Sequence, residues 1–234
     1  MSGAAAWAGA LQALGLFAAD PLGLGGITVR AGAGPVRDRW LKILYDSLPP
    51  GMPVRRVPLN AGDDRLLGGL DLAATLQAGH LVEQKGLLSE ADGGVIVLPM
   101  AERIEPGSAA RLRAASDEGQ VTLQRDGLSR VLPAHIAMVA LDEGAEPDEH
   151  PPTSLLDRMA FLIDLTKVSL RDIDYDDWSG VAPARALVMA GEADGGVVAA
   201  GKGSRPVVMA GEGPPSTPLS VAASLGVEIG RAHV

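Results

Sequence analysis

Residues 27–48 read ITVRAGAGPVRDRWLKILYDSL, and this stretch decides the fold class. Residues 27–29 form a short β-rich run, residues 30–35 form a glycine-rich turn, and residues 36–48 are predicted to form a helix. A strand, a glycine-rich loop and a helix in this order suggest an anion site, because the loop N–H groups and the helix N-terminus point at the ligand. The stretch therefore predicts an α/β unit with a phosphate-type loop.

The same alternation of β-rich and helical runs extends over residues 21–165 and predicts a largely parallel sheet flanked by helices. Residues 95–98 are apolar throughout, as expected for an interior strand that is covered on both faces. Residues 4–19 predict a buried N-terminal helix that ends at Asp20-Pro21. The remaining predicted elements are strands at 54–59, 136–141 and 161–165, a helix at 108–116 with Ser108 as N-cap, and a helix at 154–159.

A β-hairpin is predicted where residues 121–125 and 128–132 flank Asp126-Gly127. Aspartate followed by glycine favours the type I′ turn, which matches the twist of antiparallel strands. The hairpin would be an insertion into the parallel sheet.

The glycine-rich loop departs from a working phosphate loop, G-x-x-x-x-G-K-[ST], in which lysine reaches the phosphates and the hydroxyl holds magnesium. Alignment of Gly32 and Gly34 with the end of that motif puts Pro35 at the lysine position and Val36 at the hydroxyl position. Gly32 and Gly34 are thus the candidate cofactor-binding residues of a degenerate, inactive phosphate loop. The alternative, a tight turn that opens a helix, is favoured on the glycine pattern alone.

The acidic residues of a hydrolysing site are also missing. Such proteins place one carboxylate in the magnesium shell and another beside the attacking water, after the third strand. Here that strand runs into Pro99-Met100, and Glu102 comes two residues too late. The sequence predicts that the chain does not hydrolyse nucleotides.

Four further segments resemble, in order, a series from the magnesium chelatase D subunit: LGGLDL at 67–72, GLLSEADGG at 86–94, RDGLS at 125–129 and LLDR at 155–158. The resemblance covers roughly residues 20–165 and implies an AAA+ (P-loop NTPase-like) α/β fold with degenerate Walker-type nucleotide motifs and the hairpin as an insertion. In active relatives an asparagine that senses the γ-phosphate would fall near Leu141 or Asp142, and the chain has no asparagine there.

The resemblance also assigns Arg158 as an arginine finger that acts in trans, and this is the one candidate catalytic residue. A guanidinium at a subunit edge neutralises charge on a neighbour's γ-phosphate. The alternative is that Arg158 pairs with Asp157 or with another surface acid.

The function implied by the resemblance is a non-hydrolysing scaffold that supports ATP-dependent insertion of Mg²⁺ into protoporphyrin IX, in chlorophyll and bacteriochlorophyll biosynthesis for photosynthesis. The implied partners are the ATPase (I) subunit and the porphyrin-binding (H) subunit in a hetero-oligomeric ring. The complex is a ligase that uses ATP and Mg²⁺, and no cofactor is expected on this chain. The alternatives are an active MoxR-like ATPase with an atypical phosphate loop and a plain interaction domain.

Composition argues against several other classes of function. The net charge is -9 without a basic block, which argues against binding to nucleic acid or anionic lipid. The chain has no cysteine, and its four histidines lie far apart, so no metal site is predicted; a reducing, cytoplasmic setting is expected. The uncharged run at 4–19 is shorter than the ~20 residues that cross a bilayer.

Three segments are expected along the chain. Residues 1–179 form the AAA+-like domain, residues 180–227 form a Gly/Pro-rich linker or incomplete helical lid, and residues 228–234 are a non-native tail. The pentapeptide VMAGE occurs at 188–192 and again at 208–212, which is one short duplication. A D-x-S-x-S metal motif of an integrin-like domain is absent from the sequence, so the chain is interpreted as a fragment of a D subunit.

Overall fold

A computed structural model describes residues 2–125, 128–146 and 148–173 of the chain. Its centre is a five-stranded sheet in the order β2-β5-β8-β1-β9, in which every neighbouring pair is parallel. The strands are β1 (Gly26–Arg30), β2 (Val54–Arg56), β5 (Gly94–Leu98), β8 (Ile136–Asp142) and β9 (Phe161–Asp164). This is the predicted AAA+-type α/β sheet.

Three strands, β5, β8 and β1, have a neighbouring strand on both sides. Of these, β5 and β8 are buried along their whole length, and β1 is buried except at its last residue. The residues of β5 and β8 are apolar except for the last position of β8, because both faces of the sheet are covered by helices. The prediction of an interior strand at 95–98 is confirmed.

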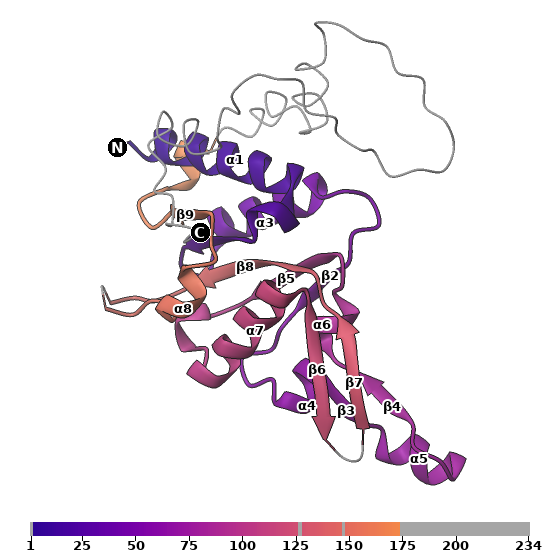
Figure 1. The fold of residues 1–234 in the computed structure, drawn as a ribbon. Coiled ribbons are helices and arrows are strands. Elements are labelled where there is room, and N and C mark those ends of the chain that lie inside the picture. Colours follow the sequence, from indigo (N-terminus) through magenta and orange to yellow (C-terminus); the bar gives the residue numbers. More distant parts are fainter. Residues whose placement is uncertain (1, 126–127, 147, 174–234) are drawn as a thin grey trace, which may run out of the picture.

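One face of the sheet is covered by α1 (Gly3–Ala19) and α3 (Pro35–Ser47), which lie against each other in Figure 1. α1 buries Trp7, Leu14 and Phe17, and the indole N–H of Trp40 donates to the carbonyl of Ala10 at 3.3 Å. Both predicted helices are confirmed, and the first is held by the second as well as by the sheet.

The opposite face carries α6 (Leu87–Glu90), α7 (Pro106–Glu118) and α8 (Thr153–Leu156) (Figure 1). The expectation that Ser108 caps α7 is wrong: the N-cap is Glu105, because Pro106 already has the backbone angle of a first helical residue. The strand expected at 54–59 ends at Arg56, shortly before Pro58, which has no N–H to donate to a neighbouring strand.

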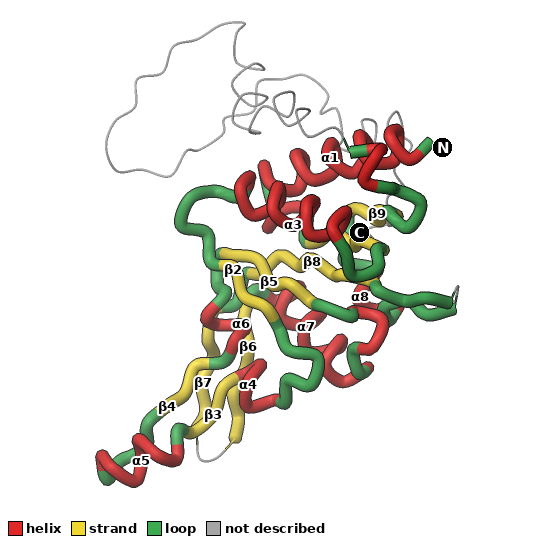
Figure 2. The backbone as a smooth tube through the Cα atoms, turned by 180° about the vertical axis from the view of Figure 1, so that it is seen from behind, coloured by secondary structure: helices red, strands yellow, loops and turns green. Residues whose placement is uncertain are grey.

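Two antiparallel pairs form an arm that projects away from the central sheet (Figure 2). One is the predicted hairpin, in which Arg125 pairs with Leu128; its turn residues 126–127 lie outside the described residues. The other pair, β3 and β4, encloses a helix and was not predicted. The elements of the arm and the remaining short elements are β6 (Gln120–Arg125), β7 (Leu128–Pro133), α4 (Asp63–Leu67), β3 (Gly68–Leu70), α5 (Leu72–Ala78), β4 (Glu83–Lys85), α2 (Pro21–Leu24), and the 3₁₀ turns Ala101–Arg103 and Leu170–Asp172.

Among the described residues, no helix is both long and apolar enough to cross a membrane. The segments expected at 180–227 and 228–234 lie outside the described residues, and so does the VMAGE duplication. Their assignments stay predictions.

Candidate functional site

The glycine-rich loop lies where the sequence predicts it, between the end of β1 and the start of α3. Gly34 is the N-cap of α3 and accepts a hydrogen bond from the Asp38 N–H at 3.0 Å. A Cβ atom built at Gly32 or Gly34 would meet no heavy atom within 4 Å, so the space around both glycines is open. The loop is therefore an accessible helix N-terminus, but Pro35 offers no N–H to an anion there.

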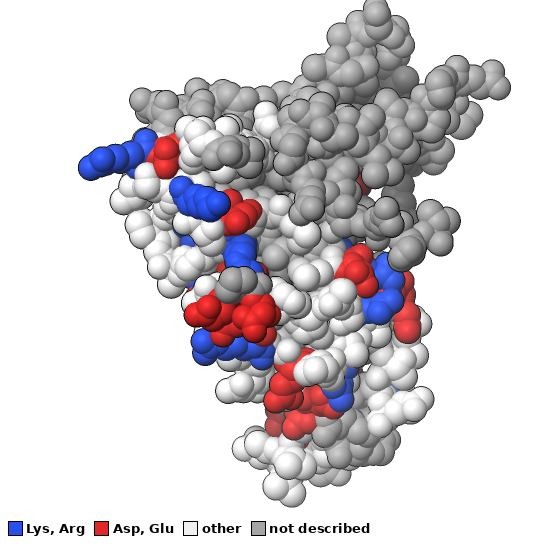
Figure 3. All heavy atoms as spheres, turned by 90° about the vertical axis from the view of Figure 1, so that its left-hand side faces the viewer, with Lys and Arg blue, Asp and Glu red and all other residues white. Residues whose placement is uncertain are grey.

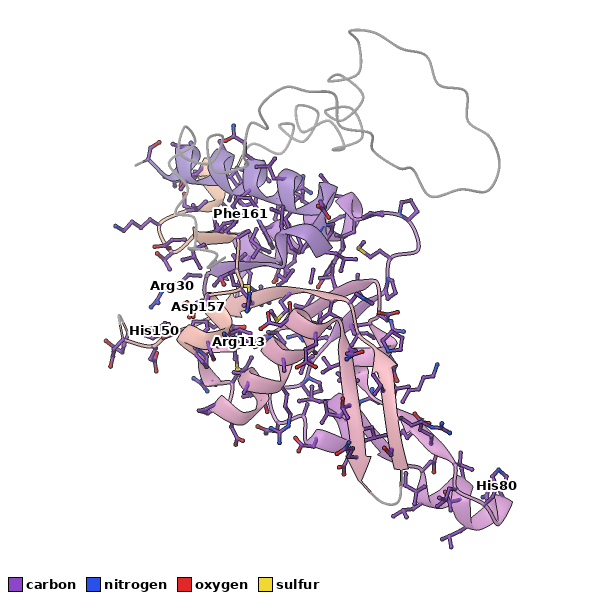
Figure 4. The ribbon with its side chains drawn as sticks, in the orientation of Figure 1. Arg30, His80, Arg113, His150, Asp157 and Phe161 are labelled. Carbon is purple, nitrogen blue, oxygen red and sulfur yellow. The ribbon has the colours of Figure 1, made fainter. Side chains whose placement is uncertain are left out.

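Arg30, the last residue of β1, binds the segment that follows β8 (Figure 4). Its guanidinium donates to Asp142 Oδ2 at 3.2 Å. Three backbone carbonyls also accept from it, those of Gly144 at 3.2 Å, Glu146 at 2.7 Å and Glu149 at 3.0 Å. We call residues 142–149 the acidic loop; Arg30 ties this loop to the carboxyl edge of the sheet.

Asp142 ends β8, and only 3% of the residue is exposed. It is one of the two positions near which the sequence resemblance puts the γ-phosphate-sensing asparagine of active relatives. Burial raises its pKa above the ordinary value of 3.8, against the opposing effects of the Gly144 N–H and the Arg30 guanidinium. The nearby carboxylate of Glu102 raises the pKa further. Asp142 is thus a buried acid whose ion-pair partner is Arg30 of the same chain.

Arg37 lies on the other side of the glycine-rich loop, in the first turn of α3. Its Nη1 is 2.8 Å from Glu143 Oε1, and both side chains are largely buried. Its Nη2 also lies 3.3 Å from the neighbouring carboxylate of Asp38. A phosphate that approached the loop would compete with carboxylates for Arg37, and also for Arg30.

Glu102, which the sequence places too late for a hydrolytic role, points at the acidic loop. Its side chain is 4% exposed, and its Oε2 accepts from the backbone N–H of Glu143 at 2.9 Å. Figure 3 looks onto this side of the molecule and shows acidic and basic side chains intermixed in patches. The surface has charges of both signs here, without the single-sign field that attracts a polyanion.

Arg158 lies just after α8, and its Nη2 donates to Asp117 Oδ2 of α7 at 2.7 Å. Of the acids considered from the sequence, the partner is thus another surface acid and not Asp157. The side chain of Arg158 is 36% exposed.

The structure does not bring Arg158 together with Gly32 and Gly34. The Ala160 N–H donates to Gly26 O at 2.8 Å, so the chain around Arg158 lies at the beginning of β1. The glycines follow the other end of that strand. At ~3.3 Å per residue, the two ends of this five-residue strand are separated by roughly 13 Å.

Sequence reasoning missed Arg30, Arg37 and Glu143 as members of the site. A signal was present, because two arginines flank the glycine-rich loop and a run of acids follows the 136–141 strand. Their pairing across the sheet edge could not be derived from spacing.

No metal site is found in the described part of the chain, because no group of three or more His, Cys, Asp or Glu residues there could hold an ion. His80 lies at the tip of the arm, far from His150 (Figure 4).

Comparison with known proteins identifies relatives of the chain. The magnesium-chelatase 60 kDa subunit of Cereibacter sphaeroides is 46% identical over 187 residues, 79% of this chain. The chain is homologous to that magnesium-chelatase subunit. It spans 30% of the length of this relative. The magnesium-chelatase 38 kDa subunit of Rhodobacter capsulatus is 30% identical over 122 residues, which cover 52% of this chain and 34% of that subunit.

A solved structure supports the fold of this magnesium-chelatase homologue. The complex between subunits BchI and BchD of magnesium chelatase contains a chain that matches with a TM-score of 0.53 and 23% identity, covering 78% of this chain and 67% of that one. At this identity the match shows a shared AAA+-type fold. No protein-family profile matches the chain.

Proposed function

We propose that the chain is a non-hydrolysing AAA+ scaffold of a magnesium chelatase, which docks the ATPase subunit and supports ATP-dependent insertion of Mg²⁺ into protoporphyrin IX. The observation that carries the proposal is the state of the glycine-rich loop. Pro35 stands at the lysine position, and the two flanking arginines are paired with carboxylates of the acidic loop. Each missing group removes a separate stabilisation of phosphate charge.

The homology supports a place in the chelatase complex, since the identity to a 60 kDa subunit is 46% and that to a 38 kDa subunit is 30%. In the proposed complex, the ATPase subunit supplies hydrolysis within a hetero-oligomeric ring. The porphyrin-binding subunit receives the resulting conformational change. ATP and Mg²⁺ are substrates of the assembly, while this chain contributes contacts.

Arg158 is proposed to act in trans on a nucleotide of the neighbouring ATPase subunit. Its position at the beginning of β1 supports this, because the chain's own glycine-rich loop is at the other end of that strand. A guanidinium that is partly exposed at such an edge can meet a phosphate presented by a second subunit.

The test has two parts. The purified chain should show no ATPase activity above a boiled control, and a pull-down should retain the 38 kDa-type ATPase subunit more strongly with ATP than without it. The isolated ATPase subunit is the positive control for turnover. ATP turnover by the chain that disappears when Gly34 is replaced would favour the alternative, an active MoxR-like ATPase.

A further inference from the structure

Arg158 is one of three charged residues that meet beside the end of α7. Asp117 Oδ2 lies 2.7 Å from Arg158 Nη2 and 3.6 Å from the Nε of Arg113. Arg113, which is labelled in Figure 4, is one turn earlier on α7. The three side chains are 30%, 36% and 44% exposed, respectively. Two cations thus share one carboxylate oxygen at the surface, and the cluster carries a net positive charge.

Two features restrict the guanidinium of Arg158. Its Nε, the nitrogen that joins the group to the aliphatic stem, is buried and has no hydrogen-bond partner among the described residues, so this side of the group is enclosed by the protein. At the tip, Asp117 holds one of the two terminal nitrogens. An exposed arginine otherwise samples many rotamers, and ordering it costs conformational entropy. Asp117 therefore limits the directions in which the guanidinium can point.

We propose that Asp117 is a positioning residue that orients Arg158 toward the terminal phosphate of a nucleoside triphosphate bound by the neighbouring subunit, with Arg113 as a second cation facing the same phosphate. The inference rests on the proposed function, because it requires Arg158 to act in trans. It adds two residues to that role, and both come from the ion-pair geometry on α7.

Substitution of Asp117 separates orientation from charge. Asp117→Asn removes a negative charge beside two arginines, so the attraction of the cluster for an anion increases. The same change removes the strong charged acceptor that orients Arg158. The kcat of ATP hydrolysis should therefore fall by about ten- to 100-fold, the larger figure being the cost of a misplacement of about 1 Å, while the KM for ATP is not raised. Asp117→Glu keeps the charge and the acceptor and should restore most of the kcat.

Arg113 should contribute to nucleotide binding through its positive charge and not through the planar shape of its guanidinium. Arg113→Lys retains the positive charge and should keep most of the activity, whereas Arg113→Ala should raise the KM for ATP a few-fold. Arg111→Ala is the matched control, because Arg111 lies on the same helix as Arg113 and has its own ion pair outside the cluster, 2.7 Å to Asp63. It should leave both constants unchanged.

The experiment uses the full-length protein with each substitution, mixed with the ATPase subunit, and measures kcat, KM, complex formation by pull-down and the Tm of each variant. The proposal is supported if Asp117→Asn lowers kcat without raising KM, Asp117→Glu recovers it, and Asp117→Asn has no further effect in an Arg158→Ala background. An unchanged kcat for Asp117→Asn, while Arg158→Ala lowers it, overturns the inference and leaves the proposed function standing. An unchanged kcat for Arg158→Ala in an intact complex overturns both the inference and the trans role. Failure of the pull-down with the unsubstituted protein refutes docking itself.

Discussion

Replacing Arg30 with methionine tests whether the acidic loop depends on a single side chain. Methionine keeps an unbranched apolar stem but removes every guanidinium N–H. Arg30 donates to three backbone carbonyls of the loop, and water can replace these donors, so each loss costs about 0.5 kcal/mol, the low end for a hydrogen bond. The Asp142 carboxylate cannot recruit water as easily, because it is 5% exposed.

Loss of the partner of Asp142 is therefore the larger cost. Removal of one member of a fully buried ion pair costs about 3 to 5 kcal/mol. The Arg30 side chain is 25% exposed, so solvent screens the pair, and about 1.5 kcal/mol is a suitable estimate. Together with the carbonyl bonds, Arg30→Met should lower the free energy of unfolding by about 3 kcal/mol.

A double-mutant cycle in urea separates the two contributions. Asp142→Asn removes the charge without changing the size of the side chain, so in that background Arg30→Met should cost only about 1.5 kcal/mol, for the carbonyl bonds. The matched control is Lys42→Met, which breaks the exposed pair of Lys42 and Asp46, 2.8 Å apart, and should cost less than about 0.5 kcal/mol. The reasoning is refuted if Arg30→Met costs no more than Lys42→Met, or if its cost is the same with and without Asp142.

Three further predictions concern packing and pH. A Cβ atom at Gly94 would collide with the backbone carbonyl of Pro53, so Gly94→Ala should destabilise the fold by roughly 2 kcal/mol or more. Gly9 lies in α1 with open space around it, so Gly9→Ala should stabilise the fold by about 0.5 to 1 kcal/mol. Similar Tm values for the two variants would contradict the packing of β5. Burial raises the pKa of Asp142 in the folded chain. The favourable contribution of Asp142 to the free energy of unfolding is therefore complete below the unfolded pKa and is lost as the pH rises through the folded pKa. Urea titrations should then show Asp142→Asn gaining stability relative to the unsubstituted chain as the pH rises through that window, and a constant difference would contradict the assignment. Glu149 should behave in the opposite sense, because hydrogen bonds from the N–H groups of Glu146 and Ala145 lower its pKa. Its contribution to the free energy of unfolding is present above the unfolded pKa and disappears as the pH falls through the folded pKa. The stability of Glu149→Gln should therefore differ least from that of the unsubstituted chain in acid.

The sequence by itself determined the elements whose signal is local. The unbroken apolar run at 95–98 predicts an interior strand, the run at 136–141 predicts a strand, and Asp126-Gly127 predicts the hairpin that the structure confirms. These predictions succeed because side-chain periodicity and turn chemistry act between near neighbours. The effect of Pro35 on the glycine-rich loop can also be predicted from sequence, because the lack of an N–H and of an ammonium group is a property of proline itself.

Only the tertiary structure decided which charged residues meet. Arg30 contacts the acidic loop across 112 positions of sequence, counted to Asp142, and Arg158 contacts Asp117 across 41. The pair β3 and β4 was also missed, because each strand has only three residues and such short strands have too little periodicity to detect. The order of parallel strands places Arg30 beside Asp142 and puts Arg158 at the opposite end of β1 from the glycine-rich loop. Such contacts depend on strand order and helix packing, which bring distant segments together and leave no repeat or spacing in the sequence.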